Sequence, residues 1–358
     1  MTWPSTRVAR LLGVGYPIVQ APMAGFTTPE LVAAVSNAGA LGALGGAMLP
    51  PDALREAIRA VRGLTEQPFA VNLFAPVEVG PVDPDAVERM QRELTPYREE
   101  LGLGAPGELR PPPPGVVDAQ LAVIAEERVP VFSFTFGIPE LAAVREAGCV
   151  ILGSATTVAE AVELERAGVD AVVAQAFEAG GHRGTFLGPF ERGLVGGIAL
   201  VPQIVDRVRV PVVLAGALMD GRGIAAALAL GAEGVQLGTA FLAAEEAGTP
   251  EAYRRLVSEA GEEATAITRA YTGRPGRAVR TRLIEHLETA GAEILPFPVQ
   301  GALLLDIRQA ATEQGVGDLL FLLAGQASGL SRRLPAGELV ETLARETEAV
   351  LAGLTAVS

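Results

Sequence analysis

Short apolar runs alternate with amphipathic segments from residue 17 to residue 241, and this alternation constrains the fold more than any other feature. Each run is rich in Val, Leu, Ala and Gly and ends in small or polar residues, as strands buried on both faces do. The segments between the runs carry apolar residues at helical spacing. The eight apolar runs are 17–23, 40–46, 69–76, 129–137, 149–156, 170–181, 210–218 and 234–241.

Eight consecutive strand–helix units predict an α/β fold with a parallel sheet, which we expect to close into a (β/α)8 TIM barrel. A doubly wound open sheet is the alternative. The predicted helices begin and end with suitable residues: Thr28-Pro29-Glu30 is a typical start, and several helical patterns stop in Ala-Gly.

Two regions interrupt the barrel pattern. Residues 77–116 hold an acidic amphipathic helix and then four consecutive prolines, 111–114, which favour a polyproline II spacer on the surface or a ligand for a recognition module. Residues 243–313 contain two helical stretches, PEAYRRLVSEAGEEA and AVRTRLIEHLETAG. We therefore expect a barrel in residues 1–242 with the insertion 77–116, a helical substrate-binding cap in 243–313, and a C-terminal return to the barrel in 314–358.

Charge and composition exclude several classes of function. The formal net charge is -14, so nucleic acid is not an expected partner. The chain has no lysine, which excludes Schiff-base chemistry. Cys149 is the single cysteine, and we expect it in the core. Neither a membrane-spanning run nor a signal-peptide pattern is present, so we expect a cytoplasmic protein.

The residues at the ends of the predicted strands are poor in charge. They show no metal-ligand spacing, no GxSxG elbow and no phosphate-binding GxxxxGK, so no metal is expected. In a barrel these strand ends converge on one face. They are Ala21, Pro22, Met23, Asn72, Thr135, Gln175, Gly216, Ala217, Gln236, Gly238 and Thr239.

The amides and glycines at these strand ends fit a phosphate-bearing cofactor. Amide side chains both donate and accept, which suits the mixed polar edge of a flavin or a nucleobase-like ring. The glycines in LAGALMDGRG and GTAF follow the last two strands, where barrels commonly bind phosphate, and the Thr239 hydroxyl adds a donor. The alternative is that these glycines only terminate strands and open helices.

His182, in AFEAGGHRGT, is one of two histidines in the chain and follows a strand end in a glycine-containing loop. Imidazole titrates near neutral pH, which makes His182 a candidate general base for a weak carbon acid; the alternative is a core or surface histidine. His286, in RLIEHLETAG, is expected on a solvated helix face. Glu178 is a candidate for catalysis, for anchoring the loop, or for pairing with Arg183.

Several segments together resemble the nitronate monooxygenases, formerly called 2-nitropropane dioxygenases. They are QAPMAGFTTPELVAAVSNAGALGALG, FAVNLFAP, AQAFEAGGHRGTF, DGRGIAAALALGAEGVQLGTAF and AGQASGL. The resemblance implies an FMN-binding TIM barrel with a helical substrate domain. It further implies oxidation of alkyl nitronates, such as propionate 3-nitronate, by O₂ to a carbonyl compound and nitrite, without NAD(P)H.

The resemblance also implies roles for individual residues. His182 corresponds to the catalytic base and substrate contact. The other implied contacts are Ala21, Pro22, Met23, Asn72, Gln175, Gly180 and Gly181 to the flavin, and Gly216, Ala217, Gln236, Gly238 and Thr239 to the phosphate. The chain departs from the family pattern at Thr135, Ala217 and Leu323, where His, Gly and Trp are common. Because Thr135 replaces an imidazole, we expect it to contact the substrate and to alter substrate preference.

Other functions stay open at this point. An NADH-dependent enoyl-[acyl-carrier-protein] reductase has a similar glycine–histidine loop, and a flavin-dependent NADH:quinone reductase and a non-catalytic flavin-binding protein are further alternatives. Arg183 in GGHRG and the AGQASGL segment favour the nitronate enzyme. The expected partners are a small-molecule substrate and O₂, with a monomer or homodimer as the assembly.

Overall fold

The computed structural model describes residues 5–78, 80–107, 115–291 and 293–355. The prolines at 111–114, for which we expected a polyproline II spacer, lie outside these ranges.

Eight parallel strands form the sheet, in the order β1-β9-β8-β6-β5-β4-β3-β2. The two ends of this order are joined by a parallel bridge between Val19 and Leu41, with the Gln20 N–H donating to the Leu41 carbonyl at 2.9 Å. The TIM barrel is therefore confirmed over the open sheet. Its strands are β1 (Ile18–Gln20), β2 (Gly42–Gly45), β3 (Phe69–Phe74), β4 (Val131–Thr135), β5 (Val150–Ala155), β6 (Ala171–Gln175), β8 (Val212–Ala215) and β9 (Gly234–Leu237).

Each barrel strand lies within one of the predicted apolar runs. The run 170–181 is longer than its strand, because the chain leaves the sheet after Gln175 and forms a separate short strand, β7 (Gly181–His182). Thr28 caps the first helix after β1 as expected, its hydroxyl accepting from the Leu31 N–H at 3.0 Å. Around the barrel lie α2 (Pro29–Asn37), α3 (Pro51–Leu64), α5 (Val116–Glu126), α6 (Ala142–Glu146), α7 (Val158–Arg166), α8 (Gly197–Val205), α9 (Gly221–Ala229) and α15 (Ala336–Thr355).

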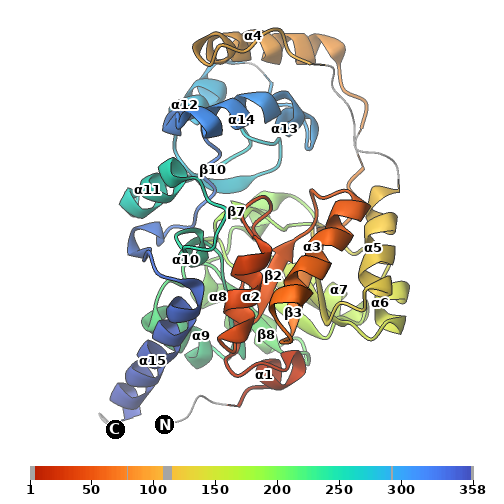
Figure 1. Ribbon diagram of the computed structural model, residues 1–358, viewed down its shortest axis with the longest axis vertical. Helices are drawn as coiled ribbons and strands as arrows, with labels where there is room; N and C mark the ends of the chain where they lie inside the picture. The colour runs from red at the N-terminus through yellow and green to blue at the C-terminus, as the bar shows by residue number, and fades with distance from the viewer. Residues whose placement is uncertain (1–4, 79, 108–114, 292, 356–358) are drawn as a thin grey trace.

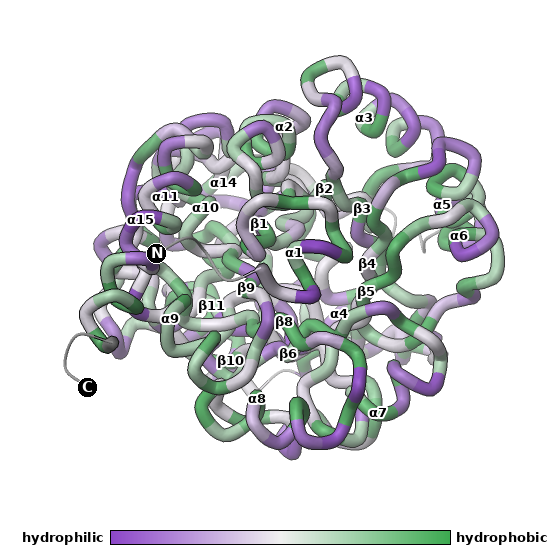
Figure 2. The backbone as a smooth tube through the Cα atoms, turned by 90° about the horizontal axis from the view of Figure 1, so that it is seen from below, coloured by the Kyte–Doolittle hydropathy of each residue, from purple (hydrophilic) through white to green (hydrophobic). Residues whose placement is uncertain are grey.

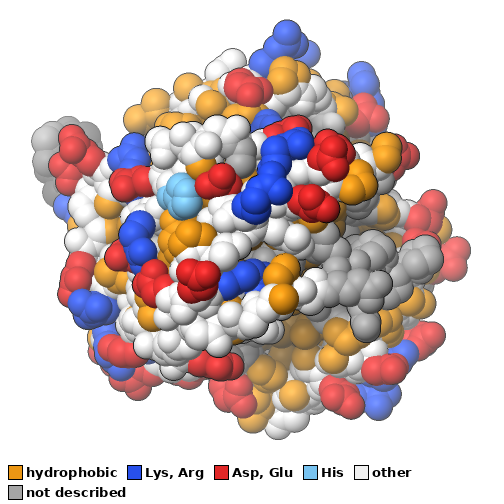
Figure 3. Space-filling view, turned by 90° about the horizontal axis from the view of Figure 1, so that it is seen from above, with side chains coloured by type: hydrophobic (Ala, Val, Ile, Leu, Met, Phe, Trp, Pro, Cys, Tyr) orange, Lys and Arg blue, Asp and Glu red, His pale blue; other side chains and the backbone are white. Residues whose placement is uncertain are grey.

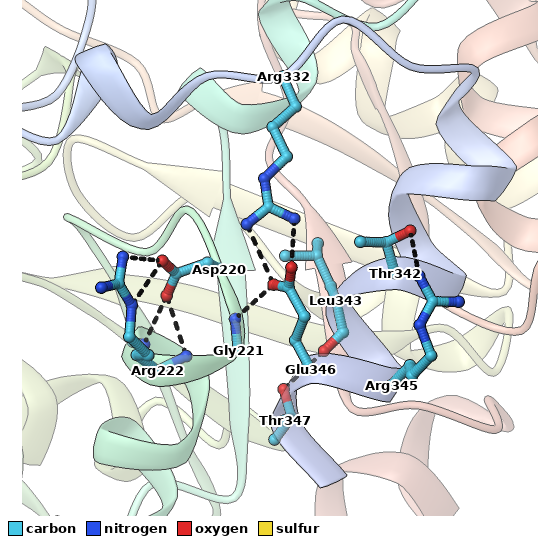
Figure 4. A network of polar contacts seen from close by, with 10 residues as sticks. Asp220, Gly221, Arg222, Arg332, Thr342, Leu343, Arg345, Glu346 and Thr347 are labelled. Carbon is cyan, nitrogen blue, oxygen red and sulfur yellow. Dashed lines mark hydrogen bonds and ion pairs between the residues drawn. The ribbon is translucent and has the colours of Figure 1, made fainter. Parts of the chain in front are cut away.

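Two helices that lie outside the strand–helix alternation in the sequence also pack on the barrel. Helix α1 (Arg7–Leu12) lies across the amino-terminal end of the barrel, where Val8 and Leu12 pack with Val19 and Leu41 (Figure 2). Helix α15 packs against α9 and α2, so the end of the chain forms part of the barrel wall. Figure 4 shows its contact with α9, in which the Gly221 N–H donates to the Glu346 carboxylate at 3.1 Å.

A second apolar core lies over the carboxyl ends of the barrel strands (Figure 1). Its elements, which we call the cap, are α4 (Pro84–Glu100), α11 (Glu251–Glu259), β10 (Thr265–Thr268), β11 (Gly276–Val279), α12 (Arg282–Thr289), α13 (Val299–Leu303) and α14 (Leu305–Gln314). Three short 3₁₀ turns, Phe190–Gly193, Gly317–Leu319 and Ser328–Leu330, and the helical turn α10 (Thr239–Leu242) complete the assigned elements of the described chain.

The cap differs from the predicted helical pattern in two elements, the strands β10 and β11. The stretch AVRTRLIEHLETAG was predicted to be helical throughout, but Ala278 and Val279 belong to strand β11, and α12 begins only at Arg282. Strand β11 pairs with β10 and with β7 of the barrel loop, both antiparallel. These partners are distant in sequence, and their pairing outweighs the local helical pattern.

The prediction that His286 lies on a solvated helix face holds only in part, because 34% of its side chain is exposed while its ring nitrogens contact another helix. Its Nδ1 atom is 2.6 Å from the Tyr97 hydroxyl, and its Nε2 atom is 3.1 Å from a Glu93 carboxylate oxygen. Both partners belong to α4, which the insertion 77–116 contributes to the cap. His286 therefore joins α12 to α4, a contact that a helical charge pattern does not reveal.

The remaining expectations concern the core and the surface. Cys149 is buried in the barrel core, as predicted. None of the helices in the described ranges has the length and hydropathy needed to cross a membrane. On the cap face shown in Figure 3, acidic and basic side chains are interspersed.

Candidate active site

A cavity of about 1100 Å³ lies between the carboxyl ends of the barrel strands and the cap. Its lining includes residues from the strand ends and from α13 and α14. The structure brings every residue predicted for the site to this cavity: Ala21, Pro22, Met23, Asn72, Thr135, Gln175, Gly180, Gly181, His182, Gly216, Ala217, Gln236, Gly238 and Thr239. Leu323, the third departure from the family pattern, also lines it.

The loop that carries His182 is held from the barrel side by Gln175. The Gln175 Nε2 donates to the His182 carbonyl at 2.8 Å, and the Gly184 N–H donates to the Gln175 Oε1 at 2.8 Å. Buried Arg183 adds hydrogen bonds to backbone carbonyls, including one of 2.6 Å to Ala176. Gln175 and Arg183 therefore fix the direction in which the loop leaves β6.

Two carboxylates anchor the same region. The Gly197 N–H, in the first turn of α8, donates to both carboxylate oxygens of Glu178 at 3.1 Å. Of the roles considered for Glu178, the structure supports anchoring of the loop. Fully buried Glu160 accepts from the N–H groups of Phe186 and Leu187 at 2.6 and 3.0 Å. Sequence reasoning missed Glu160, because it occupies an ordinary helical pattern.

The cap holds the loop from the other side. Strand β11 pairs with β7 in the register Gly276↔His182. The Arg274 Nε donates to the Arg183 carbonyl at 3.1 Å, and its Nη2 donates to the Thr185 carbonyl at 2.8 Å. The loop is thus clamped between barrel and cap. The run TGRPGR, at 272–277, was the available sequence signal, because it places two arginines among turn residues.

The His182 ring lies in a largely aromatic environment. The rings of Phe74, Phe136 and Phe297 meet it edge-on, with centroids 6.5, 5.9 and 6.0 Å away. Its Nε2 atom is 2.8 Å from the Thr272 hydroxyl of the cap. Burial, and secondarily the positive charge of Arg274, lowers the pKa of His182 to about 4. The imidazole is therefore neutral at neutral pH and is able to accept a proton.

Phe136 has a strained backbone beside this ring. Its φ of 81° lies in the left-handed region, which a bulky side chain rarely adopts. The Arg274 guanidinium lies 3.7 Å from the centroid of the Phe136 ring and holds it against His182. Strain of this kind persists only where the surroundings enforce it, and it is concentrated at functional sites.

The opposite side of the cavity offers backbone and hydroxyl groups. Gly216 and Ala217 follow β8 with φ of 131° and 55°, so Ala217 keeps a glycine-like conformation despite its methyl group. The Thr239 hydroxyl accepts from the Gly325 N–H at 3.0 Å and keeps its own proton for another acceptor. The Asn72 Nδ2 donates to the Ser133 hydroxyl at 3.0 Å.

The site has space beside two of its glycines, whereas a Cβ at Gly180 would lie 2.4 Å from the Ala324 carbonyl carbon. A Cβ at Gly181 would meet no atom within 4 Å, and one at Gly238 would meet only the Ala21 Cβ, at 3.4 Å. Within the ranges described, no group of three or more His, Cys, Asp or Glu side chains could hold a metal ion. The donor set of amides, hydroxyls and backbone suits an uncharged heteroaromatic ring with a phosphate group.

Comparison with known proteins agrees with this geometry. Residues 5–346 match the family model described as nitronate monooxygenase. The chain is 41% identical over 352 residues to a probable nitronate monooxygenase of Staphylococcus saprophyticus, covering 97% of this chain and 99% of that protein. A probable nitronate monooxygenase of Staphylococcus aureus is 40% identical over 353 residues, with 98% and 99% covered.

Two solved structures extend the comparison. A nitroalkane oxidase from Streptomyces ansochromogenes superposes with a TM-score of 0.89 and 39% identity, covering 97% of this chain and 99% of that one. FabK from Thermotoga maritima gives a TM-score of 0.78 and 31% identity, with 99% of both chains covered. The extent of the family match, from the first described helix to within α15, shows that this chain belongs to the nitronate monooxygenase family of oxidoreductases.

Proposed function

We propose that this enzyme binds FMN in the cavity and oxidises alkyl nitronates with O₂ to a carbonyl compound and nitrite. The observation that carries this proposal is His182: a neutral imidazole, surrounded by aromatic rings, on the wall of a cavity where the strand ends offer uncharged donors. Family membership and the similarity to a nitroalkane oxidase support the same reaction class.

The cavity residues fit FMN. The volume of the cavity is slightly above the range of about 300–1,000 Å³ usual for ligand sites. The cavity is therefore large enough for a cofactor and a small substrate together. The ring would contact the 21–23 segment, Asn72 and Gly181, while Gly216, Ala217, Gly238 and Thr239 would hold the phosphate. When bound, FMN supplies the redox chemistry by taking electrons from the nitronate and passing them to oxygen.

His182 has a separate task for each form of the substrate. With a neutral nitroalkane, a ring nitrogen removes the proton from the carbon that bears the nitro group, and the imidazolium is formed only transiently because burial disfavours it. With a nitronate, no proton needs to be removed, and the ring N–H donates to a nitronate oxygen. The Thr272 hydroxyl, which is hydrogen-bonded to the His182 Nε2 atom, fixes the orientation of the imidazole for both tasks.

The surrounding side chains orient the substrate and limit water. Phe74, Phe136 and Phe297 cover the ring of His182 with apolar edges, which strengthens polar interactions in the site. Thr135 lines the cavity, and its hydroxyl donates to the Ser154 hydroxyl at 3.3 Å. A hydroxyl there gives a weaker anion contact than the imidazole common in the family, so substrate binding depends more on His182.

A second candidate function comes from the similarity to FabK. An NADH-dependent enoyl reductase would use the same cavity and loop but would take hydride from a nicotinamide. A flavin-bleaching assay distinguishes the nitronate enzyme from the reductase. We expect the purified protein to be yellow with an FMN spectrum. Anaerobic addition of propionate 3-nitronate should bleach the flavin, whereas NADH should not. Bleaching by NADH alone would contradict the nitronate assignment and favour the reductase.

A further inference from the structure

The two ring nitrogens of His182 have different surroundings. The Nε2 atom lies 2.8 Å from the Thr272 hydroxyl of the cap. No residue in the described ranges forms a hydrogen bond with Nδ1, and this atom is not enclosed by protein atoms. Because His182 lines the cavity, Nδ1 is the nitrogen that opens onto it.

The orientation of the ring is fixed from several sides. The Gln175 Nε2 donates to the His182 carbonyl at 2.8 Å, which holds the main chain. The edges of Phe136 and Phe297 flank the imidazole, with centroids 5.9 and 6.0 Å away. A ring that was turned over would place a carbon atom at Thr272 and lose the hydrogen bond to it.

The other contacts of the Thr272 hydroxyl assign the proton on the ring. The Arg274 N–H donates to this hydroxyl at 3.3 Å, and the hydroxyl donates to the Arg274 carbonyl at 3.5 Å. A hydroxyl has one proton and two lone pairs, so only an acceptor position is left for His182. Nε2 therefore carries the ring proton, and Nδ1 presents a lone pair to the cavity.

A tight turn sets the place of this hydroxyl. Gly273 has a φ of 85°, and a Cβ there would overlap the Leu295 carbonyl oxygen, so only glycine fits. The Gly273 N–H donates to the Arg269 carbonyl at 2.8 Å. The position of Thr272 is thus fixed by packed backbone on the cap side of the cavity.

The hydroxyl orients the ring without adding charge. A carboxylate in its place would stabilise the imidazolium and raise the pKa of His182. With the neutral hydroxyl, burial and the charge of Arg274 lower this pKa to about 4. The ring is therefore both oriented and free of a second proton before a substrate arrives.

We propose that Nδ1 is the nitrogen that removes the proton from a neutral nitroalkane, and that Thr272 is the positioning residue that keeps the Nδ1 lone pair toward the cavity. This inference rests on the proposed function. The C–H bond beside the nitro group breaks, its electron pair forms the C=N bond of the nitronate, and a displaced N=O pair stays on oxygen. The proton moves to Nδ1 while Nε2–H stays donated to Thr272, and the ring releases the proton to water when the product leaves.

The same hydroxyl also suits a substrate that is already a nitronate. Because a hydroxyl donates as well as accepts, Thr272 can exchange its long contact with the Arg274 carbonyl for donation to Nε2. The ring then takes the tautomer with its proton on Nδ1. The N–H that meets a nitronate oxygen is therefore on the same nitrogen.

The kinetic test compares 1-nitropropane with propyl nitronate on the FMN-loaded full chain. Thr272→Val keeps the branched shape but leaves the imidazolium, which forms only with 1-nitropropane, with a buried N–H that lacks an acceptor. We expect kcat for 1-nitropropane to fall about 10–100-fold, the usual range for a lost charged hydrogen bond, and kcat for propyl nitronate to fall about fivefold or less. Thr272→Ser keeps the hydroxyl and should retain most of the activity.

The matched control is Thr289→Val on α12. It removes an exposed hydroxyl that donates to helix carbonyls, and both rates should equal those of the wild type. An equal loss for both substrates in Thr272→Val, or the same loss in Thr272→Ser, would assign Thr272 to the fold and overturn the proposal.

A spectroscopic test observes the ring directly. The chain has two histidines, so ¹⁵N-histidine labelling reports two rings, and His182→Ala identifies the signals of His182. In the FMN-loaded protein without substrate at neutral pH, we expect a protonated Nε2 and an unprotonated Nδ1. Thr272→Val should show both tautomers in exchange, because the ring has lost its acceptor.

These spectra separate the inference from the proposed function. If the wild-type protein oxidises neither substrate, the proposed function fails, and the spectra alone decide on Thr272. A proton on Nε2 that Thr272→Val releases supports its positioning role. A proton on Nδ1 in the wild type, or identical His182 signals in both proteins, overturns it.

Discussion

At the scale of single residues, the chemistry of the site depends on how His182 is kept neutral. An imidazole in water titrates near pH 6.5, so a large fraction would be protonated in a mildly acidic medium. In this cavity the aromatic neighbours and the positive Arg274 both disfavour the charged ring, and its pKa is about 4. The ring is therefore available as a base at lower pH than an exposed histidine, although its strength as a base is reduced.

The pH dependence of the reaction tests this state. Because a base must be unprotonated, kcat/KM for a neutral nitroalkane is expected to show no acid limb from His182 between about pH 5 and pH 8, and to fall only as the pH approaches the lowered pKa of about 4. His182→Ala should lose about 10²–10⁴-fold in the same assay while retaining FMN. A limb near the ordinary histidine pKa, absent in the variant, would contradict the buried neutral state.

The site residues at the strand ends could be predicted from the sequence, because a barrel brings the carboxyl ends of its strands together once the strands are identified. The pattern of apolar runs alone therefore predicted that Asn72 and Gln236 lie at the site, and both line the cavity. Thr272 and Arg274 could not be found in this way. They lie in an irregular segment of the cap whose contact with His182 depends on tertiary packing.

At the scale of elements, the decisive feature is the pairing of β11 with β7. Both are short, and neither has a periodic pattern that would distinguish a strand from a loop or a helix end. Their conformation comes from each other and from β10. For the same reason α4 could be predicted as a helix, but its packing on α12 through His286 could not.

This clamp makes Arg274→Gln informative. Burial lowers the pKa of Arg274 to about 10, so it is still charged at neutral pH and raises the cost of protonating His182. Glutamine keeps a donor for one loop carbonyl but removes the charge. The pKa of His182 should therefore rise, moving the acid limb of kcat/KM to higher pH.

The matched control for this prediction is Arg269→Gln, which removes an exposed charge that faces Phe190 outside the cavity. Its pH profile is expected to equal that of the wild type. An unshifted limb in Arg274→Gln would show that burial alone sets the pKa of His182. Hydrogen exchange of residues 181–186 reports independently whether the loop has loosened.

At the scale of the whole molecule, the barrel was predictable because its eight strands and most of its helices are local patterns repeated in order. The contacts that complete the barrel wall join residues far apart in the sequence. Helix α15 returns from the cap and packs on α9, where Gly221 meets the backbone of Glu346 and Thr347 (Figure 4). The amphipathic pattern of α15 predicts a helix, but not the glycine against which it packs.

The close approach at Gly221 yields a prediction for the stability of the assembled barrel. A Cβ there would lie 2.4 Å from the Glu346 carbonyl carbon and 2.4 Å from the Thr347 nitrogen, so α15 would have to shift. Gly221→Ala is therefore expected to lower the free energy of unfolding by about 1–3 kcal/mol, as overpacking does. Denaturant unfolding, followed by circular dichroism on the FMN-loaded protein, measures the change.

Gly353→Ala, in α15, provides the control. A Cβ at Gly353 would meet no atom within 4 Å, and alanine is the better helix former by about 1 kcal/mol at most. This variant should be as stable as the wild type or slightly more stable. Equal stability of all three proteins would mean that α15 is not packed tightly on α9. A loss in Gly221→Ala alone ties the C-terminal helix to the integrity of the barrel, because only the position that contacts α15 responds.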